Sequence, residues 1–292
     1  MRVLVTGANG QLGMSIRKLH TDPAVVFSDV VDIPGVETVK LDITDLEAVR
    51  SLVREQRIDA IVNCAAFTNV DAAESEPEQA ERLNAQAPEN LALAMKEVGG
   101  LLVHISTDYV FGGEPEDTPL REDHPCAPTS VYGRTKLHGE EAIRRVGCRH
   151  VIIRTAWLYS EYGKNFVKTM LRLSAERPQI KVVSDQIGTP TYAGDLAAAV
   201  LTILSTVAVP AGTYHFSNKG SCSWYEFACE IVRQAQDGRA CEILPCRSDE
   251  YPSSVRRPAY SVLDKTLIRE TFGLRIPHWT ESLRRCLSVL LA

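Results

Sequence analysis

The first 155 residues alternate between short apolar runs and longer stretches in which apolar positions recur with a helical period. Short buried runs predict strands, and the amphipathic stretches predict the helices between them. The predicted strands are Arg2–Thr6, Val25–Asp29, Ala60–Val62, Leu101–Ile105 and His150–Thr155, and the predicted helices are Gln11–His20, Leu46–Glu55, Glu78–Val98 and Val131–Val146. Strands joined by helices of this length favour parallel pairing with right-handed crossovers. We therefore expect an α/β fold with a Rossmann-type, doubly wound parallel sheet.

The regular alternation ends after Trp157. The pattern there predicts helices at Asn165–Glu176, Gly194–Ser205, Ser223–Gln234 and from Thr280, a strand at Tyr214–Ser217, and loops at Ser184–Tyr192 and Tyr251–Tyr260. We expect residues 1–160, with 188–218 returning to them, to form the Rossmann domain. Residues 161–187 and 219–292 would form a smaller C-terminal cap. Ligands of doubly wound folds bind beyond the carboxyl ends of the strands, so this cap would cover them.

Composition excludes several classes of function. Of 292 residues, 45% are hydrophobic, and 32 Lys and Arg stand against 37 Asp and Glu, giving a net charge of -5 without blocks of like charge. This balance argues against a nucleic-acid partner or a membrane-surface role. The longest apolar runs are too short to cross a bilayer. Eight scattered cysteines without metal-ligand spacing, and no leader pattern at the N-terminus, predict reduced thiols, no zinc site and a cytoplasmic location.

A glycine-rich turn follows the first predicted strand and opens the first helix, with glycines at Gly7, Gly10 and Gly13. Glycine allows a tight turn and a close approach of backbone to a pyrophosphate, whose oxygens the free N–H groups of the helix can bind. The alternative is a turn without a ligand. Asp29 ends the second strand, where a carboxylate accepts ribose hydroxyls and repels a 2′-phosphate, which favours NAD(H) over NADP(H). Asp32 is a competing candidate for this role.

Tyr132 and Lys136 lie one turn apart on the same face of a predicted helix. A free tyrosine has a pKa of about 10, and a nearby cation favours its phenolate. The pair gains significance from the stretch His104–Asp108, which supplies the hydroxyl of Thr107 at the end of a predicted strand. Together these residues predict acid–base chemistry beside a bound dinucleotide.

From the glycine turn to Lys136, the sequence resembles the extended short-chain dehydrogenase/reductase family. Within it, the sequence is similar to the dTDP-4-dehydrorhamnose reductases in the motifs Asn63–Glu74, Ser106–Phe111, Val131–Lys136, Arg154–Trp157, Gly163–Phe166, Asp185–Thr191 and His215–Phe227. The resemblance runs from residue 1 to near the C-terminus. It implies an NAD(P)H-dependent oxidoreductase that reduces the C4 keto group of dTDP-4-dehydro-6-deoxy-L-mannose to give dTDP-L-rhamnose, with NADH preferred and NADPH as an alternative.

The resemblance also implies roles for individual residues. Tyr132 would donate the proton, Lys136 would tune it and hold the ribose, and Thr107 would polarise the keto group. The cofactor would contact Gly7, Gly10, Gln11, Leu12, Gly13, Asp29, Asp42, Ile43, Ala65, Ala66, Phe67, Thr68, Tyr132 and Lys136. The dTDP-sugar would contact Thr107, Asp108, Tyr132, Trp157, Asn165, Gln186 and Arg257. For Arg257 a physical argument stands beside the resemblance, because arginine pairs bidentately with a pyrophosphate dianion.

Other readings of the same motifs remain open. Related 4,6-dehydratases carry a glutamate where this sequence has Tyr109, so elimination is disfavoured, whereas chemistry alone does not exclude an epimerase. A non-catalytic, dinucleotide-binding regulatory subunit is the rival class. Ser15 replaces a glutamate that bridges magnesium-linked dimers in some relatives, so we expect no metal and leave monomer and homodimer open. Trp157 and Phe111 are equally good core residues, His104 is expected to be a packed histidine, and Cys64 a small apolar residue.

Overall fold

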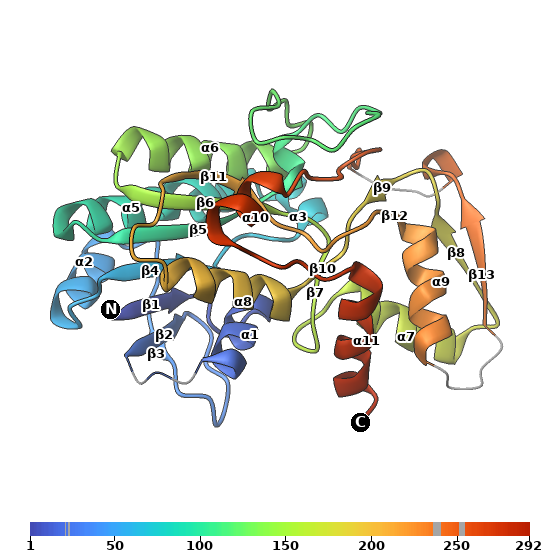
Figure 1. Cartoon of the computed structure of the whole chain (residues 1–292), viewed down its shortest axis with the longest axis horizontal. Coiled ribbons are helices and arrows are strands. Elements are labelled where there is room, and N and C mark those ends of the chain that lie inside the picture. Colours follow the sequence, from blue (N-terminus) through green and yellow to red (C-terminus); the bar gives the residue numbers. More distant parts are fainter. Residues whose placement is uncertain (21, 23, 236–240, 251–254) are drawn as a thin grey trace.

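The computed structural model describes residues 1–20, 22, 24–235, 241–250 and 255–292 (Figure 1). Its centre is a parallel sheet that has seven strands within these residues. In spatial order they are β11 (Gly212–His215), β6 (Arg149–Thr155), β5 (Leu101–Thr107), β4 (Ala60–Asn63), β1 (Val3–Thr6), β2 (Val25–Asp29) and β3 (Val39–Lys40). This order, with β1 between β2 and β4, is doubly wound. The fold class expected from the sequence is therefore confirmed.

Helices cover both faces of the sheet (Figure 1). One face packs against α1 (Gln11–Leu19), α8 (Ala193–Leu204) and α10 (Thr266–Phe272), and the other against α2 (Leu46–Glu55), α5 (Ala87–Val98) and α6 (Val131–Val146). The strands are apolar on both faces because both faces are covered. Helix α10 was not predicted, and Ile268 and Phe272 bury it against the sheet although the predicted division assigns residues 219–292 to the cap.

The predicted helix Glu78–Val98 is wrong in its middle. The segment consists of α4 (Pro77–Glu81), a π-helical turn (Arg82–Gln86) and α5, and it follows α3 (Val70–Ser75). Asn84 lies in the π-helical turn, fully buried, and its side chain binds backbone outside the helix. π-helical turns are frequent at functional sites because the wider turn re-aims a side chain.

A smaller lobe lies at one end of the sheet (Figure 1). It contains α7 (Phe166–Glu176), α9 (Trp224–Ala235) and α11 (Trp279–Leu290) around a parallel strand pair, β8 (Gln179–Val183) and β13 (Glu242–Cys246). The strand pair was not predicted. The predicted loop Ser184–Tyr192 contains β9 (Ile187–Gly188) and β10 (Thr191–Tyr192), which pair with β12 (Cys222–Ser223) and β7 (Leu158–Tyr159). Residues 251–254 of the predicted loop Tyr251–Tyr260 lie outside the described residues.

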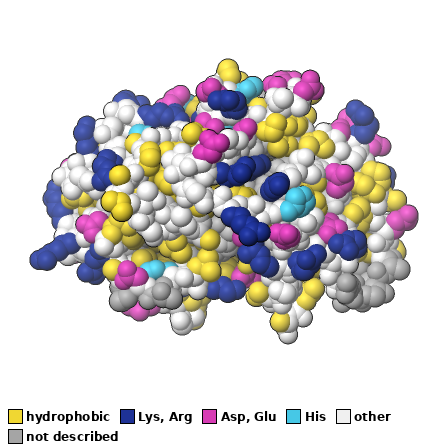
Figure 2. Space-filling model, in the orientation of Figure 1, with side chains coloured by type: hydrophobic (Ala, Val, Ile, Leu, Met, Phe, Trp, Pro, Cys, Tyr) yellow, Lys and Arg dark blue, Asp and Glu magenta, His cyan; other side chains and the backbone are white. Residues whose placement is uncertain are grey.

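Three further properties concern the surface charge, membrane-spanning helices and metal-binding clusters. Lys, Arg, Asp and Glu side chains are interspersed on the face shown in Figure 2, with several Lys and Arg side chains near its middle. Among the described residues, no helix combines the length and apolar character needed to cross a bilayer. The same residues contain no group of three or more His, Cys, Asp or Glu side chains placed to hold a metal ion.

Candidate functional site

The carboxyl ends of β1, β4 and β5 meet at one edge of the sheet. The glycine turn follows β1, and its shape depends on missing side chains. Gly7 has a φ of +63°, and a Cβ there would lie 2.6 Å from the backbone nitrogen of Ala65. A Cβ on Gly13 would lie 2.5 Å from the Cα of Ala8. Glycine at position 7 therefore lets the turn pack against the loop after β4, and glycine at position 13 lets α1 pack against the turn itself.

The N-terminus of α1 is open to a ligand. Gly10 caps the helix without a side-chain hydrogen bond, so the first N–H groups of α1, including those of Gln11 and Leu12, have no partner from a cap. A helix N-terminus with this backbone exposure binds phosphate oxygens. The turn thus fits the pyrophosphate of a dinucleotide, as the sequence predicts for Gly7, Gly10, Gln11, Leu12 and Gly13.

Asp29 stands at the end of β2, half-buried, with its carboxylate held by the backbone. Its Oδ2 accepts a hydrogen bond from Asn9 N at 3.0 Å, and its Oδ1 accepts one from Val31 N at 3.1 Å. These bonds fix the carboxylate beside the glycine turn and leave further lone pairs for hydroxyl groups. Asp32, the competing candidate, is exposed on the following turn.

Asp42 and Ile43, two of the predicted cofactor residues, differ in how far their side chains are exposed. Asp42 is exposed, and hydrogen bonds from Thr44 to its carboxylate lower the pKa of Asp42. The Ile43 side chain is buried in the core under α2 and α5, so only its backbone faces outward. The backbone oxygen of Ile43 accepts a hydrogen bond from Asn90.

The loop Ala65–Thr68 lines the same edge after β4 and is held in place by Asn84. Asn84 Oδ1 accepts from Phe67 N at 2.8 Å, and its Nδ2 donates to Phe67 O at 3.1 Å and to Thr135 Oγ1 at 3.1 Å. The side chain therefore satisfies both backbone groups of Phe67. Asn84 was missed at the level of sequence, because a buried amide within a helical pattern carries no motif. Ala65, Ala66 and Phe67 are half-buried and Thr68 is exposed.

Tyr132, Thr107 and Lys136 are brought together where α6 crosses the end of β5. The Tyr132 phenol lies close enough to Thr107 for that hydroxyl to lower the pKa of Tyr132. Thr107 Oγ1 donates to Asp108 Oδ1 at 3.0 Å and accepts from the backbone N–H of Tyr109 at 3.2 Å, which fixes its side chain at the strand end. Lys136 is buried one turn farther along α6, and its Nζ donates to the backbone oxygen of Ile105 at 2.7 Å. The predicted catalytic residues thus share one site, in which Thr107 and Lys136 are buried and Tyr132 is half-buried.

Close approach of α6 to the strand end depends on Gly133. A Cβ at this position would lie 2.2 Å from the backbone oxygen of Tyr109. Ser130 begins the helix by accepting a hydrogen bond from Gly133 N, which is the usual N-cap arrangement. This local geometry brings the first turn of α6, and with it Tyr132, against Thr107.

Burial shifts the pKa values of Tyr132 and Lys136 in the directions that favour their neutral forms. Desolvation raises the pKa of Tyr132 above its ordinary value, and the hydrogen bond with Thr107 offsets only part of this rise. Desolvation lowers the pKa of Lys136 to about 8, against the opposing effect of Glu140. The expectation that Lys136 favours the phenolate stays a prediction, and in this arrangement desolvation is the largest cause acting on the pKa of Tyr132.

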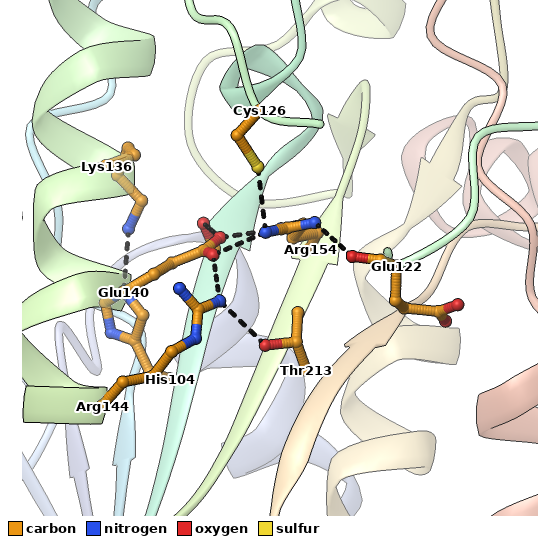
Figure 3. Close-up of polar contacts among 9 residues, drawn as sticks. His104, Glu122, Cys126, Lys136, Glu140, Arg144, Arg154 and Thr213 are labelled. Carbon is orange, nitrogen blue, oxygen red and sulfur yellow. Dashed lines mark hydrogen bonds and ion pairs between the residues drawn. The ribbon is translucent and has the colours of Figure 1, made fainter. Parts of the chain in front are cut away.

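Glu140 is a buried charge that the sequence did not reveal as part of the site. It accepts hydrogen bonds from Ser106 Oγ, from Arg154 Nε and Nη2, and from Arg144 Nη2, at 2.6 to 2.9 Å (Figure 3). These partners hold the pKa of Glu140 below its usual value despite the opposing effect of burial. The cluster ties α6 to β5 and β6 directly behind Lys136.

Asp108 and Trp157 lie on the side of the site that faces the lobe. Asp108 is 2% exposed, its Oδ2 has no hydrogen-bond partner, and burial raises its pKa to about 6. Trp157 has a φ of +48° and stacks on Trp224, with ring centroids 3.6 Å apart. A non-glycine residue in this region is uncommon and is typical of functional sites.

A cavity of about 1160 Å³ in the lobe is lined by apolar side chains of α7 and by charged residues of both signs. Gln186 and Arg257, both predicted to bind the nucleotide sugar, belong to its lining. Arg257 donates to Asp71 at 3.0 Å and lies 3.5 Å from the hydroxyl of Tyr109. The Tyr109 ring in turn contacts the Tyr132 ring, with centroids 5.4 Å apart, so Arg257 is linked to the catalytic tyrosine through Tyr109.

Asn165 has a different position from the other predicted substrate residues. It caps α7 by accepting from Lys168 N, and its Nδ2 donates to Gln11 Oε1 at 3.0 Å. Asn165 therefore joins the lobe to the glycine turn and does not line the cavity.

Comparisons with known proteins agree with this geometry. A family model described as the RmlD substrate binding domain matches residues 1–291. The spore coat polysaccharide biosynthesis protein SpsK of Bacillus subtilis is 43% identical over 287 residues, covering 98% of this chain and 96% of SpsK. A solved dTDP-4-dehydrorhamnose reductase from Clostridium acetobutylicum has a TM-score of 0.92 and 42% identity over 100% of both chains.

A second solved structure bears on the cofactor. It is the dTDP-4-dehydrorhamnose reductase of Bacillus anthracis in complex with NADP, with a TM-score of 0.89 and 40% identity over 99% of both chains. The likeness extends over the sheet and the lobe together, as does the family match. The chain therefore belongs to the family described as the RmlD substrate binding domain.

Proposed function

We propose that the protein is an NAD(P)H-dependent oxidoreductase that reduces the C4 keto group of dTDP-4-dehydro-6-deoxy-L-mannose to give dTDP-L-rhamnose, the last step of dTDP-rhamnose synthesis. The observation that carries the proposal is the arrangement of the half-buried Tyr132 with the buried Thr107 and Lys136 at the end of β5. Full-length similarity to dTDP-4-dehydrorhamnose reductases supports the substrate class.

The nicotinamide cofactor, when bound, supplies the hydride. The roles of the chain's own side chains follow from their protonation. Tyr132 remains a neutral phenol because burial raises its pKa, so it can donate its proton to the developing alkoxide at O4 of the sugar. Thr107 would stabilise the same oxygen by a hydrogen bond, and Lys136 would hold the cofactor's ribose and supply the proton that restores the Tyr132 phenol.

NADH is proposed as the preferred reductant, with NADPH as an alternative. The support is the half-buried Asp29 carboxylate, which would accept ribose hydroxyls and repel a 2′-phosphate. The Bacillus anthracis relative was solved in complex with NADP, which supports NADPH as the alternative reductant. Asp29→Ala should therefore raise kcat/KM for NADPH relative to NADH, and an unchanged ratio in steady-state assays would contradict this role.

The lobe cavity is proposed to take the dTDP part of the substrate. Arg257 and Gln186 would contact the nucleotide diphosphate side, and Asp108 and Trp157 the sugar. We also propose that the chain divides into two parts, a Rossmann domain (1–160 and 188–218) and a substrate-binding cap (161–187 and 219–292). A cytoplasmic location and a monomeric or homodimeric state belong to the same proposal. Neither a nucleic acid nor a membrane is proposed as a partner.

The test is reductant oxidation followed by absorbance, with dTDP-4-dehydro-L-rhamnose formed in situ by its epimerase. We expect epimerase-dependent consumption of NADH that matches the dTDP-L-rhamnose formed. Binding of NADH without turnover would instead support the regulatory subunit, and turnover only with another 4-keto sugar nucleotide would change the substrate.

A further inference from the structure

A row of buried polar side chains crosses the sheet beneath Lys136. Thr6 on β1 donates to Asn63 Oδ1 at 2.7 Å, and Asn63 on β4 lies 3.0 Å from His104 Nδ1 through its Nδ2. His104 on β5 then places its Nε2 3.3 Å from Lys136 Nζ (Figure 3). All four residues are at most 1% exposed, so water does not compete for these contacts.

The backbone fixes the direction of this row. The N–H of Ala65 donates to Asn63 Oδ1 at 3.2 Å, and a backbone N–H cannot accept a hydrogen bond. The amide oxygen of Asn63 must therefore face Ala65, and its NH₂ group must face His104. His104 Nδ1 accepts that hydrogen, so a neutral His104 carries its own proton on Nε2. Burial and the nearby Lys136 hold the pKa of His104 well below its usual value, which keeps the ring neutral.

The Nε2–H of His104 points at Lys136 Nζ. An ammonium group has no lone pair to accept this hydrogen, whereas a neutral amine accepts it and still donates to Ile105 O. The neutral amine thus satisfies both contacts and the ammonium only one. The row consequently favours the amine form of Lys136.

The charged and titratable groups near Lys136 come from three elements. On α6, Tyr132 and Glu140 lie one turn away on either side, and Arg144 binds Glu140 from the next turn. From β6, Arg154 pairs with the same carboxylate, and β5 contributes His104. Glu140 favours the ammonium form of Lys136, but its charge is already matched by two guanidinium groups.

We propose that Asn63 and His104 are positioning residues that hold His104 as its Nε2–H tautomer and thereby poise Lys136 to exchange protons near neutral pH. The proposal rests on the proposed function, in which Lys136 returns a proton to Tyr132. A donor with a pKa near the working pH transfers protons more efficiently than an ordinary lysine. Desolvation acts in the same direction, since burial lowers the pKa of Lys136 to about 8.

The first test reads the tautomer without any turnover. In the full chain labelled with ¹⁵N-histidine, two-bond ¹H–¹⁵N correlation spectra distinguish the two neutral tautomers, and His104→Gln identifies the signal by its loss. His150 and His215 are internal references for the opposite tautomer, because their Nδ1 atoms face the backbone oxygens of Cys148 and Leu120. We expect an Nε2–H tautomer for His104. An Nδ1–H tautomer or an imidazolium would overturn the proposal while leaving the proposed reaction untouched.

The second test uses Asn63→Asp to reverse the direction of the hydrogen bonds between position 63, His104 and Lys136. A carboxylate at this position still accepts from Ala65 but also accepts from His104 Nδ1–H, so the Nε2 lone pair would turn toward Lys136 and stabilise its ammonium form. We expect the alkaline limb of kcat/KM to move up by at least one pH unit and the His104 tautomer to change. Thr6→Val is the matched control: it removes a contact to Asn63, but Ala65 keeps the amide orientation, so the limb and the tautomer should stay.

Thermal unfolding and NADH binding establish that each variant is folded. A folded Asn63→Asp protein with an unmoved limb, or a Thr6→Val protein whose limb moves equally far, would overturn the proposal. If Asn63→Asp does not fold, the tautomer of the unmodified protein decides.

Discussion

Ionised tyrosine is an anion and ionised lysine is a cation, yet desolvation favours the neutral form of both Tyr132 and Lys136. The pKa of Tyr132 rises and the pKa of Lys136 falls to about 8, with desolvation as the largest cause in each case. A neutral phenol is the form that can donate a proton to a reduced sugar oxygen. The direction of these shifts therefore suits reduction, in which Tyr132 acts as the acid.

Removing the phenolic hydroxyl tests that assignment. Tyr132→Phe keeps the ring contact with Tyr109 but removes the proton donor, so we expect kcat to fall by about 10² to 10⁴ while the Kd for NADH is unchanged. Fluorescence titration measures the Kd, and steady-state kinetics measures kcat. A variant with near-normal turnover would show that another group supplies the proton.

Asp108 should make stability depend on pH in an identifiable window. Its folded pKa of about 6 is above the unfolded value of about 3.9, so the folded state binds more protons between these values and loses stability as pH rises through them. The penalty at pH 7 is at most about 3 kcal/mol, from a shift of about two units. Asp108→Asn removes the ionisation.

The stability difference between Asp108→Asn and the unmodified protein should therefore grow in favour of the variant from pH 4 to pH 7. Urea unfolding at both pH values measures it, and the comparison of two proteins cancels the other titrating groups. A difference that is the same at both pH values would contradict the raised pKa.

At the scale of elements, the contact between α6 and the end of β5 places the acid. Gly133→Ala would place a methyl group against the Tyr109 backbone oxygen, so α6 must shift and carry Tyr132 with it. We expect a loss of stability of about 1–3 kcal/mol and a fall in kcat larger than the change in Kd for NADH. Gly212→Ala, where a Cβ meets only a side chain at 3.5 Å, is the control and should be near neutral. Equal effects at both positions would argue against a close contact at Gly133.

The contacts of Glu140 with Arg154, Arg144 and Ser106 should contribute strongly to the free energy of unfolding. Glu140→Gln leaves the guanidinium group of Arg154, whose side chain is 3% exposed, without its charge partner. Breaking a buried pair in this way costs about 3–5 kcal/mol. The exposed pair Arg172–Glu176 provides the control, since Glu176→Gln should change the free energy of unfolding by at most about 1 kcal/mol. Chemical denaturation measures both, and similar values would contradict the importance assigned to burial.

The sequence predicts elements well where local signals mark their ends. The helices Leu46–Glu55 and Val131–Val146 match the structure to the residue, because Asp45 and Ser130 are N-caps and Gly147 ends the second helix. The interruption of the predicted helix Glu78–Val98 has no such signal. The strands β8 and β13 pair across some sixty residues of chain, and local periodicity does not report a contact of that range.

The residues of the candidate site also fall into those that local motifs predict and those that only long-range contacts bring in. The glycine turn, Tyr132, Lys136 and Thr107 lie in spaced motifs, so their association follows from the sequence. Other members of the site, Asn63, Asn84 and Glu140, act through contacts between elements far apart in the chain. Their contribution is visible only when the sheet and α6 are assembled.

For the whole molecule, the proposed reaction requires the sheet edge and the lobe cavity to act on one substrate. Arg257 lines the cavity and also lies near Tyr109 beside the catalytic tyrosine. If it binds the pyrophosphate, Arg257→Gln should raise KM for the dTDP-sugar about tenfold or more with a smaller change in kcat, because it loses a charge-assisted hydrogen bond. Arg172→Gln, on the exposed side of α7, should leave KM unchanged. Equal KM values for both variants in steady-state kinetics would place the pyrophosphate elsewhere.

The most direct measurement of the central claim is epimerase-dependent NADH oxidation with dTDP-4-dehydro-L-rhamnose, with the sugar nucleotide product identified by chromatography and mass spectrometry. We predict one dTDP-L-rhamnose formed for each NADH consumed, with both rates about 10² to 10⁴ lower for Tyr132→Phe. NADH binding without any reduced sugar nucleotide, for the unmodified protein, would contradict it.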